Sequence, residues 1–266
     1  MSAKPKRKAA SRPSRKQPIR IVLLGEGGGV LRRAAEAVGL TVVDAGDPCD
    51  LVVTYGGDGS LLGAERDFPD VPKMPIRRGT EYDKCARHTD HEVFSRVAAG
   101  TQSITTLPRL QVTLRGKTAS AINDIVLHNA KVTSGVRYRI RIDDEPYSTE
   151  IVGDGVVVAT PFGSSAYYRS ITNSVIRVGI GIAFNNSTEA VTHLVVREDS
   201  RVYVEVTRGP AVLVGDNQLE PFNVERGDVL CIQQALDQSV IWELETLTCL
   251  DCRSRLTGKP AGFRHV

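Results

Sequence analysis

The chain has 266 residues, of which 41% are hydrophobic, 24% charged and 5% aromatic. This composition excludes a disordered polymer, a collagen and a disulfide-stapled miniprotein, and the length allows one large domain or two modest ones. The formal net charge is +3, but the first twenty residues hold eight Lys or Arg and no acid, which leaves 26 basic against 31 acidic residues, or about −5, for the rest. A broadly cationic, nucleic-acid-binding body is therefore disfavoured.

The first eighteen residues are mainly Lys, Arg, Ser, Pro and Ala, with almost nothing to bury. Such a segment does not offset the entropy of becoming ordered, so we interpret residues 1–18 as a flexible basic tail. A solubilising role is favoured, and an organelle-import peptide or a weak contact with nucleic acid stays open.

The chain contains no apolar run near the eighteen residues that a membrane span needs, so we expect a cytoplasmic protein without a membrane contact. The five cysteines are an odd number without framework spacing, which fits a reducing compartment. The pair Cys249 and Cys252 forms a lone Cys-x-x-Cys, which we interpret as two unrelated thiols rather than as a zinc or redox site. None of the five histidines is expected to bind a metal.

Residues 19–100 carry the pattern of an α/β domain. The β-branched run at residues 19–24 ends in a glycine-rich turn at residues 25–29, which opens a segment with apolar residues at helical spacing. Apolar strands follow at residues 40–43 and 50–55. Nearly continuous apolar strands joined by helices predict a small, Rossmann-like parallel sheet.

From residue 101 the pattern changes to alternating strands, for example at residues 110–114, 137–142, 202–206 and 229–232. This alternation predicts an antiparallel, all-β domain over residues 101–245. Residues 246–266 are expected to return to the N-terminal domain. The predicted fold is thus an α/β domain followed by a β domain.

A first candidate site is the turn Gly56-Gly57-Asp58-Gly59-Ser60 that follows the strand at residues 50–55. Glycines let a ligand approach backbone N–H groups, and a helix that opens at Ser60 would favour an anion. A carboxylate in such a place would hold a cation or accept a hydroxyl proton. An ordinary turn remains the alternative.

A second candidate is the pair Asn123 and Asp124, which interrupts an apolar run at residues 121–127. An amide reads the edge of a base, and a carboxylate binds sugar hydroxyls. Adjacent side chains of a strand point to opposite faces, so both could serve one ligand only where a strand ends or bulges. A polar turn between two strands is the alternative.

The third candidate is the longest: a Gly-Asp-Gly at residues 153–155, an apolar strand, and then a turn with small hydroxyl residues. Serines there could cap a helix or bind a ligand, and a tyrosine offers a flat stacking face. The residues singled out are Asp154, Thr160, Ser164, Ser165, Ala166 and Tyr167.

Over about residues 19–245, the order of these motifs resembles that of the NAD kinase family. The motifs are GGDGS, then Asn-Asp, then GDG followed by TPFGSSAY. The resemblance implies a two-domain kinase that transfers the γ-phosphoryl group of ATP, with Mg²⁺, to the 2′-hydroxyl of the adenosine ribose of NAD. It implies Asp58 as the catalytic carboxylate, Gly57 and Gly59 in the phosphate turn, and Asn123 and Asp124 on base and ribose.

The resemblance further implies an adenine pocket at residues 165–167, with Asp154 at the acceptor end of the ligand, contributed across the interface of a homodimer or homotetramer. Asp216 and Asn217 occupy the place of the family's Asp-Gly turn, and we expect Asn217 to keep its left-handed backbone.

Two segments depart from the family pattern. Arg77 and Arg78 stand where the family has small residues and a phenylalanine, and they could bind a different charged acceptor or lie on a surface loop. Residues 169–176 are bulkier than the family's glycine-rich segment. A kinase for another polyol, such as a sugar, a nucleoside or an inositol, is therefore an alternative, and a catalytically silent nucleotide sensor is a second one.

Overall fold

The computed structural model describes residues 18–80 and 83–257. The predicted basic tail of residues 1–18 lies, except for Pro18, outside the described residues. The last nine residues of the C-terminal segment, 258–266, also lie outside them.

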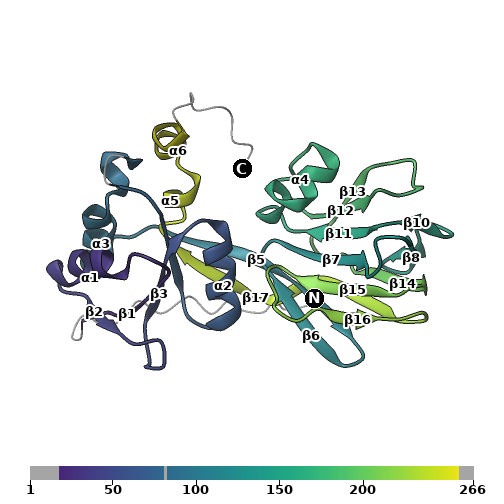
Figure 1. The fold of residues 1–266 in the computed structure, drawn as a ribbon, viewed down its shortest axis with the longest axis horizontal. Helices are drawn as coiled ribbons and strands as arrows, with labels where there is room; N and C mark the ends of the chain where they lie inside the picture. The colour runs from purple at the N-terminus through teal and green to yellow at the C-terminus, as the bar shows by residue number, and fades with distance from the viewer. Residues whose placement is uncertain (1–17, 81–82, 258–266) are drawn as a thin grey trace, which may run out of the picture.

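The N-terminal half is a parallel sheet with helices packed on it (Figure 1). Strand β3 pairs in parallel with β1 and β4, and β1 pairs in parallel with β2. The apolar run Leu51–Val53 of the central strand β3 is fully buried, as its unbroken hydrophobic sequence predicts, whereas the edge strand β2 is partly exposed. The elements are β1 (Arg20–Leu24), α1 (Gly28–Ala37), β2 (Thr41–Val43), β3 (Leu51–Gly56), α2 (Asp58–Asp67), β4 (Lys73–Arg77), η2 (Ala86–His88) and α3 (Asp90–Ala99).

Strand β4 is absent from the sequence-based prediction. It begins at Lys73 and contains Pro75, two residues that are unfavourable in a buried strand. The Lys73 ammonium is nevertheless buried, because its Nζ lies 3.0 Å from Glu65 Oε1 on α2. A tertiary ion pair thus permits a strand that local propensity disfavours.

The second half contains two packed antiparallel sheets whose inner faces form a large apolar core that includes the fully buried Tyr138. One sheet has the order β13-β12-β11-β7-β15-β16, and β8, β10 and β14 belong to the other. The strands up to β11 are β5 (Ile104–Leu114), β6 (Lys117–Ala121), β7 (Asp124–Asn129), β8 (Val136–Ile142), β9 (Glu145–Pro146), β10 (Ile151–Gly153) and β11 (Gly155–Ala159).

After β11 come a short helical turn and helix, and then the strands that complete both sheets. These elements are η3 (Gly163–Ser165), α4 (Tyr167–Thr172), β12 (Ile180–Asn185), β13 (His193–Val196), β14 (Val202–Arg208), β15 (Ala211–Gly215), β16 (Phe222–Val224), β17 (Val229–Trp242), α5 (Glu245–Thr248) and α6 (Leu250–Thr257). An α/β region followed by antiparallel sheets is the predicted fold class, which is confirmed.

Strands β5 and β17 run between the two halves and join them (Figure 1). The first part of β17 pairs with β14, whereas Ile241 near its end pairs in parallel with Lys73 of β4. One sheet is therefore continuous from the β half into the parallel half. Helix α5 then packs on β4, where the Thr246 hydroxyl donates to the Pro75 carbonyl.

No helix in the described part of the chain is both long enough and apolar enough to cross a membrane.

Candidate functional site

The turn from Gly56 to Ser60 joins β3 directly to α2. Gly57 precedes the helix, Asp58 is its first residue, and the Asp58 side chain is exposed. A Cβ on Gly56 would lie 2.1 Å from Ser60 Oγ, so a glycine here lets the Ser60 hydroxyl lie against the turn. The turn therefore presents a carboxylate and free helix N–H groups on one surface.

The second predicted segment is a tight turn between β6 and β7 that is organised by Asp216. The Asp216 carboxylate accepts the backbone N–H groups of Ile122, Asn123 and Asp124 at 2.8, 2.9 and 3.1 Å. Asp216 itself has a left-handed backbone with a φ of 48°, whereas the φ of Asn217 is not positive. The expectation that Asn217 adopts the left-handed conformation is therefore wrong, and its neighbour takes that role.

Both polar residues of this turn are buried, with 8% of Asn123 and 7% of Asp124 exposed. Burial raises the pKa of Asp124 to about 7, and the nearby Asp216 carboxylate adds to the rise. The buried Asn123 Oδ1 has no hydrogen-bond partner in the described part of the protein. A buried, unpaired amide oxygen is costly, so this atom would gain from a hydrogen-bond donor.

The turn after β11 packs directly on the Asn123 turn. The Thr160 N–H donates to the Asn123 carbonyl at 2.9 Å, and the Thr160 hydroxyl donates to the Ile122 carbonyl at 2.6 Å. A Cβ on Gly163 would lie 2.0 Å from the Asn123 carbonyl oxygen, so only glycine permits this approach. The structure thus brings two of the three predicted segments together.

The two serines of this turn have different surroundings. Ser164 is buried, its hydroxyl donates to the Pro161 carbonyl at 2.8 Å, and it accepts the Ile176 N–H at 3.0 Å. It therefore holds the η3 turn to the segment after α4. Ser165 and Ala166 are exposed beside it, and the Ser165 hydroxyl makes a local contact with the Phe162 carbonyl.

Tyr167 and Asp154 lie farther along the same surface. The Tyr167 hydroxyl accepts from Asn185 Nδ2 at 3.0 Å, and the Asp154 carboxylate accepts from Asn186 Nδ2 at 3.0 Å. Burial raises the pKa of Tyr167, and the charges of Asp154 and Asp124 raise it further, which places its phenol within electrostatic reach of both carboxylates.

The separation of Asp124 and Asp154 along the sheet follows from the strand pairing. Asp124 begins β7, and His128 of the same strand pairs with Gly155, next to Asp154. Asp154 therefore lies opposite Asn129, whose N–H donates to the Asp154 carbonyl at 2.7 Å, and five residues of a strand span about 17 Å. The surface from Asp124 to Asp154 is therefore long enough for an extended ligand with two ends.

Helix α2 is attached to the turn that Asp216 organises. Asn217 Nδ2 donates to the Gly59 carbonyl at 3.2 Å, and Arg66 Nη1 donates to the Asn217 carbonyl at 3.1 Å. Because Gly59 follows Asp58 and Asn217 follows Asp216, these bonds hold the phosphate-type turn beside the Asn123 turn. The three predicted segments therefore form one candidate site between the two halves.

The two arginines that depart from the family pattern have protein partners. Arg77 is partly buried, and its Nη2 donates to the Leu247 carbonyl of α5. Arg78 is exposed, and its Nη2 lies 3.0 Å from Glu26 Oε2 in the turn before α1. Its backbone N–H donates to the Gly56 carbonyl at 3.2 Å, so this segment supports the GGDGS turn from behind.

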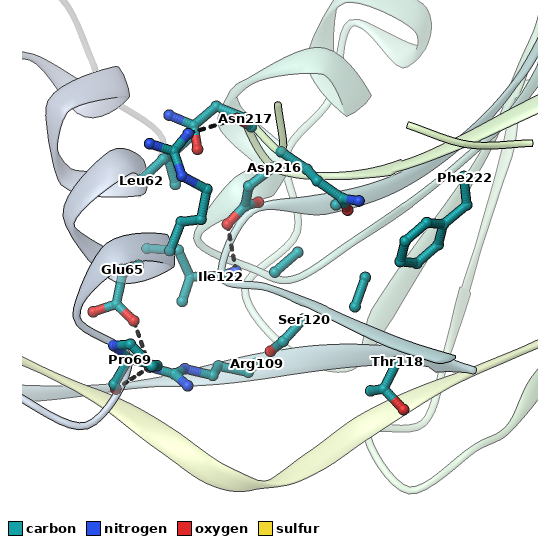
Figure 2. A pocket seen from close by; sticks show the side chains of 15 residues that line it. Leu62, Glu65, Pro69, Arg109, Thr118, Ser120, Ile122, Asp216, Asn217 and Phe222 are labelled. Carbon is teal, nitrogen blue, oxygen red and sulfur yellow. Dashed lines mark hydrogen bonds and ion pairs between the residues drawn. The ribbon is translucent and has the colours of Figure 1, made fainter. Parts of the chain in front are cut away.

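A cavity of about 250 Å³ lies between α2 and the β half, as Figure 2 shows. Glu65 lines it and accepts hydrogen bonds from Arg109 and from the Ser239 hydroxyl, in addition to its ion pair with Lys73. Asp58, Asn123 and Asp124 are not among the residues that line this cavity. Asp216 does line it, so the cavity borders the candidate site, while Glu65 and Arg109 join the two halves.

The structure also gathers four residues that the sequence kept apart: Cys85, His88, Cys249 and Cys252. The expectation that the Cys-x-x-Cys holds two unrelated thiols, and that each histidine stands alone, is wrong. A Cys-x-x-His spacing at residues 85–88 was the signal that could have revealed the second pair.

Within the described residues, no group of three or more carboxylates is arranged to cage a cation. Mg²⁺ commonly binds through one or two carboxylates together with substrate phosphates. The exposed Asp58 at the start of α2 suits a magnesium ion that arrives with a nucleotide.

Comparison with known proteins identifies the family that this chain resembles. Residues 122–242 match the model of the ATP-NAD kinase C-terminal domain. The chain is 35% identical over 126 residues to an NAD kinase of Clostridium perfringens, a match covering 44% of this chain and 45% of the relative. It is 37% identical over 135 residues to an NAD kinase of Pseudomonas putida strain W619, covering 47% and 45%. The matches thus span about half the length of these curated relatives.

Two solved structures share the fold over nearly the whole chain. A yeast NADH kinase in complex with NADH has a TM-score of 0.75 at 19% identity, covering 94% of this chain and 91% of that one. An NAD kinase from Archaeoglobus fulgidus in complex with ATP has a TM-score of 0.70 at 19% identity, covering 90% and 99%. The resemblance to the NAD kinase family is confirmed.

Proposed function

We propose that this chain, whose C-terminal half matches that of the NAD kinases, transfers the γ-phosphoryl group of ATP to the 2′-hydroxyl of the adenosine ribose of NAD, giving NADP. The observation that carries the proposal is the bond from Asn217 to the Gly59 carbonyl, because it holds Asp58 beside the Asn123 turn. A glycine-rich anion site and a base-and-ribose site would then act on one substrate pair.

Asp58 is proposed as the general base. Its carboxylate would accept the proton of the 2′-hydroxyl as that oxygen attacks the γ-phosphorus and the bond from phosphorus to the ADP oxygen breaks. Its exposure leaves room for both substrates, and its place at the start of α2 puts the positive end of the helix near the phosphates. Gly56, Gly57, Gly59 and Ser60 would shape the phosphate turn.

Asn123 and Asp124 are proposed to bind the adenosine of the acceptor. The unpaired Asn123 Oδ1 can accept a base amino group, and an ionised Asp124 can accept two ribose hydroxyls. Thr160 and Ser164 hold the neighbouring turn in place, while Ser165, Ala166 and Tyr167 are proposed to line the base pocket.

Asp154 is proposed to contact the far end of the dinucleotide, about 17 Å along β7 from Asp124. In a homodimer or homotetramer of the kind we propose, this residue could serve the partner subunit's ligand. We also propose a cytoplasmic location.

Mg²⁺ bound with ATP would neutralise charge on the β- and γ-phosphates. The chain's own residues would position the hydroxyl in line with the phosphorus, which is the main requirement of a loose phosphoryl-transfer transition state.

The experiment is an acceptor panel with the purified chain, Mg²⁺-ATP and NAD, NADH, a nucleoside, a sugar and an inositol, with phosphorylated products identified by mass spectrometry. The proposal expects NADP from NAD, and none when Mg²⁺ is chelated. If a non-dinucleotide were phosphorylated and NAD were not, NAD would be wrong as the proposed acceptor. Dinucleotide binding without any product would favour the silent sensor.

A further inference from the structure

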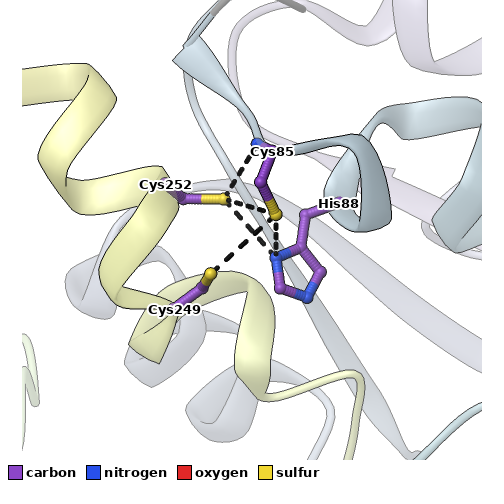
Figure 3. A group of neighbouring side chains, drawn as sticks. All are labelled: Cys85, His88, Cys249 and Cys252. Carbon is purple, nitrogen blue, oxygen red and sulfur yellow. Dashed lines mark hydrogen bonds between the residues drawn. The ribbon is translucent and has the colours of Figure 1, made fainter.

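Four side chains that could bind a metal meet where the C-terminal helices contact the N-terminal half (Figure 3). Cys85 and His88 come from the η2 turn, while Cys249 and Cys252 flank the start of α6. Their four ligand atoms all lie within 4.8 Å of one another. The proposed kinase chemistry uses none of them.

The distances fit one tetrahedral ion. With Zn–S bonds of about 2.3 Å and a Zn–N bond of about 2.0 Å, sulfur atoms lie about 3.8 Å apart and a sulfur lies about 3.5 Å from the nitrogen. The Cys85 Sγ atom lies 3.9 Å from Cys249 Sγ and 3.6 Å from Cys252 Sγ. His88 Nδ1 lies 3.2 Å from Cys85 Sγ and 3.4 Å from Cys252 Sγ.

The spacing of the ligands has a physical basis as well. Cys-x-x-His and Cys-x-x-Cys each place two ligands on one tight turn, so two short turns complete a four-ligand set. The backbone N–H of Cys85 donates to Cys252 Sγ at 3.3 Å, an interaction that would stabilise a thiolate.

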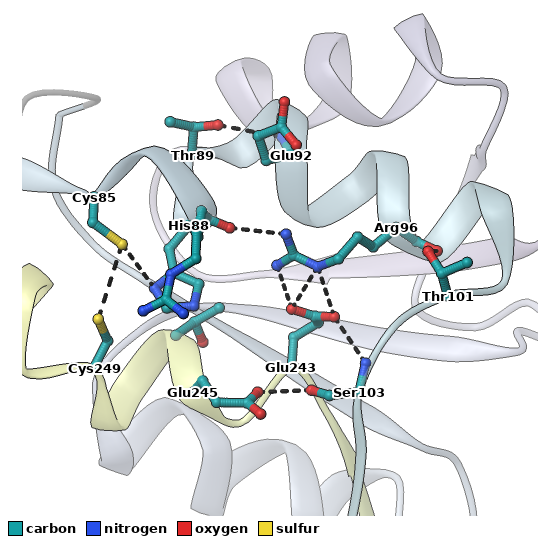
Figure 4. Close-up of polar contacts among 12 residues, drawn as sticks. Cys85, His88, Thr89, Glu92, Arg96, Thr101, Ser103, Glu243, Glu245 and Cys249 are labelled. Carbon is teal, nitrogen blue, oxygen red and sulfur yellow. Dashed lines mark hydrogen bonds and ion pairs between the residues drawn. The ribbon is translucent and has the colours of Figure 1, made fainter.

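The surroundings hold the η2 turn in position, as Figure 4 shows. The Arg96 guanidinium donates to the Arg87 carbonyl at 2.9 Å and pairs with the buried Glu243 carboxylate. Glu243 also accepts the Ser103 N–H at 2.9 Å. This network fixes the backbone that carries His88 and leaves the ring nitrogen facing the thiols.

Cys85, His88 and Cys252 are buried and Cys249 is partly buried, so the four ligands enclose the centre. A neighbouring cavity of about 590 Å³ is lined by His88 and Cys249, among others, and offers a route for an ion. Four protein ligands leave no open position, which is the arrangement of a structural rather than a catalytic zinc site.

We propose that Cys85, His88, Cys249 and Cys252 bind one Zn²⁺ that fastens the α5–α6 segment to the N-terminal half. The three thiols release their protons on binding, and no oxidant or reductant takes part. The ion would hold the segment after β4, whose Arg78 N–H supports the Gly56 carbonyl, so it would stabilise the back of the GGDGS turn without touching a substrate.

The first test is metal analysis of the full chain purified under reducing conditions without chelator. About one zinc per chain is expected. Stripped protein should regain one equivalent of Zn²⁺, and Co²⁺ should give the absorption of a tetrahedral thiolate site. Protein that arrives without metal and takes up neither ion would overturn the proposal, as would iron in place of zinc.

The second test compares His88→Ala with His91→Ala, and Cys252→Ser with Cys231→Ser. His91 is an exposed histidine three residues away, and Cys231 is a thiol on β17. Only the ligand variants should lose zinc, to below about a tenth of an equivalent, and lower the Tm by about 5 °C or more. Equal zinc content in each pair would refute the assignment.

A third readout covers ligand variants that fail to fold and separates zinc binding from a disulfide. In the wild-type chain, zinc should protect Cys85, Cys249 and Cys252 from alkylation until a chelator is added, with no reductant required. Thiols that become reactive only after reduction, in protein without metal, would show a disulfide instead and contradict the proposal.

Discussion

Asp124 is the ionisable group whose surroundings bear most directly on the site. It is 7% exposed, and burial together with Asp216 raises its pKa to about 7. The folded carboxyl therefore holds its proton more tightly than the unfolded one, whose pKa is about 3.9. As pH rises from about 4 to about 7, the unfolded state releases this proton first and the free energy of unfolding falls.

Asp124→Asn should remove this fall in the free energy of unfolding at higher pH, because an amide does not ionise. The stability of the variant relative to wild type should be greater at about pH 8 than at about pH 4, by about 3 kcal/mol. Denaturant unfolding at both pH values measures the difference. Part of the wild-type slope remains in the variant, since burial also raises the pKa of Asp216.

The matched control is Asp199→Asn, which changes a carboxylate with 72% exposure. Its stability relative to wild type should stay nearly constant over the same range. A flat difference for Asp124→Asn as well would show that the carboxyl is already ionised at low pH, and would contradict the burial argument.

At the scale of single residues, sequence reasoning identified residue types but not their partners. Asn123 and Asp124 stand out because two polar residues interrupt an apolar run. Nothing local indicates that Asp216 binds the backbone of both, because that contact joins segments far apart in the chain. The Cys-x-x-His spacing of Cys85 and His88 is visible in the sequence, but their approach to Cys249 joins distant segments and is not.

At the scale of elements, the contact between the η3 turn and the start of β7 depends on Gly163. A Cβ there would lie 2.0 Å from the Asn123 carbonyl oxygen and would push the two turns apart. Gly163→Ala should therefore lower the free energy of unfolding by about 2 kcal/mol or more. Dinucleotide affinity measured by calorimetry should also fall.

Gly29→Ala is the control, because a Cβ at Gly29 in α1 meets nothing within 4 Å. That variant should be unchanged or more stable by about 0.5 to 1 kcal/mol, since alanine is the better helix former. Equal effects of the two substitutions would mean that the η3 turn does not require a glycine.

Periodicity located the elements well where burial is uniform, as in β3 and β11, whose apolar runs are buried along their length. It missed β4, since Lys73 and Pro75 disfavour a strand and the ion pair with Glu65 is visible only in three dimensions. In β4 the tertiary contact outweighs the low strand propensity of these residues.

At the scale of the whole molecule, Glu65 links the two halves. It lies on α2, pairs with Lys73 of β4, and accepts from Arg109 of β5 and Ser239 of β17. Burial lowers the pKa of Lys73, so this ammonium depends on the nearby carboxylate.

Glu65→Gln leaves the buried Lys73 ammonium without its ion-pair partner, while Arg109 keeps Asp237 Oδ2 at 2.8 Å, and it should cost about 3 kcal/mol of stability or more. Asp67→Asn breaks an exposed ion pair with Arg66 on the same helix and should cost at most about 1 kcal/mol. Chemical denaturation of both variants measures the costs. A Glu65→Gln variant as stable as Asp67→Asn would show that the junction does not depend on this charge.

The order of α/β and β regions was predictable because strand and helix periodicities are local. The continuous sheet was not, since the pairing of Ile241 with Lys73 joins distant parts of the chain. The same long-range pairing brings α2 to the β half and so assembles the candidate site.

The most direct test of the proposed phosphoryl transfer is NADP formation by Asp58→Asn compared with wild type and with Asp67→Asn. The account predicts a kcat lower by about 10² to 10⁴ in Asp58→Asn, with ATP and NAD affinities within a few fold of wild type, because a general base acts mainly in the transition state. Asp67→Asn should retain full activity. Undiminished NADP formation by Asp58→Asn would contradict the account.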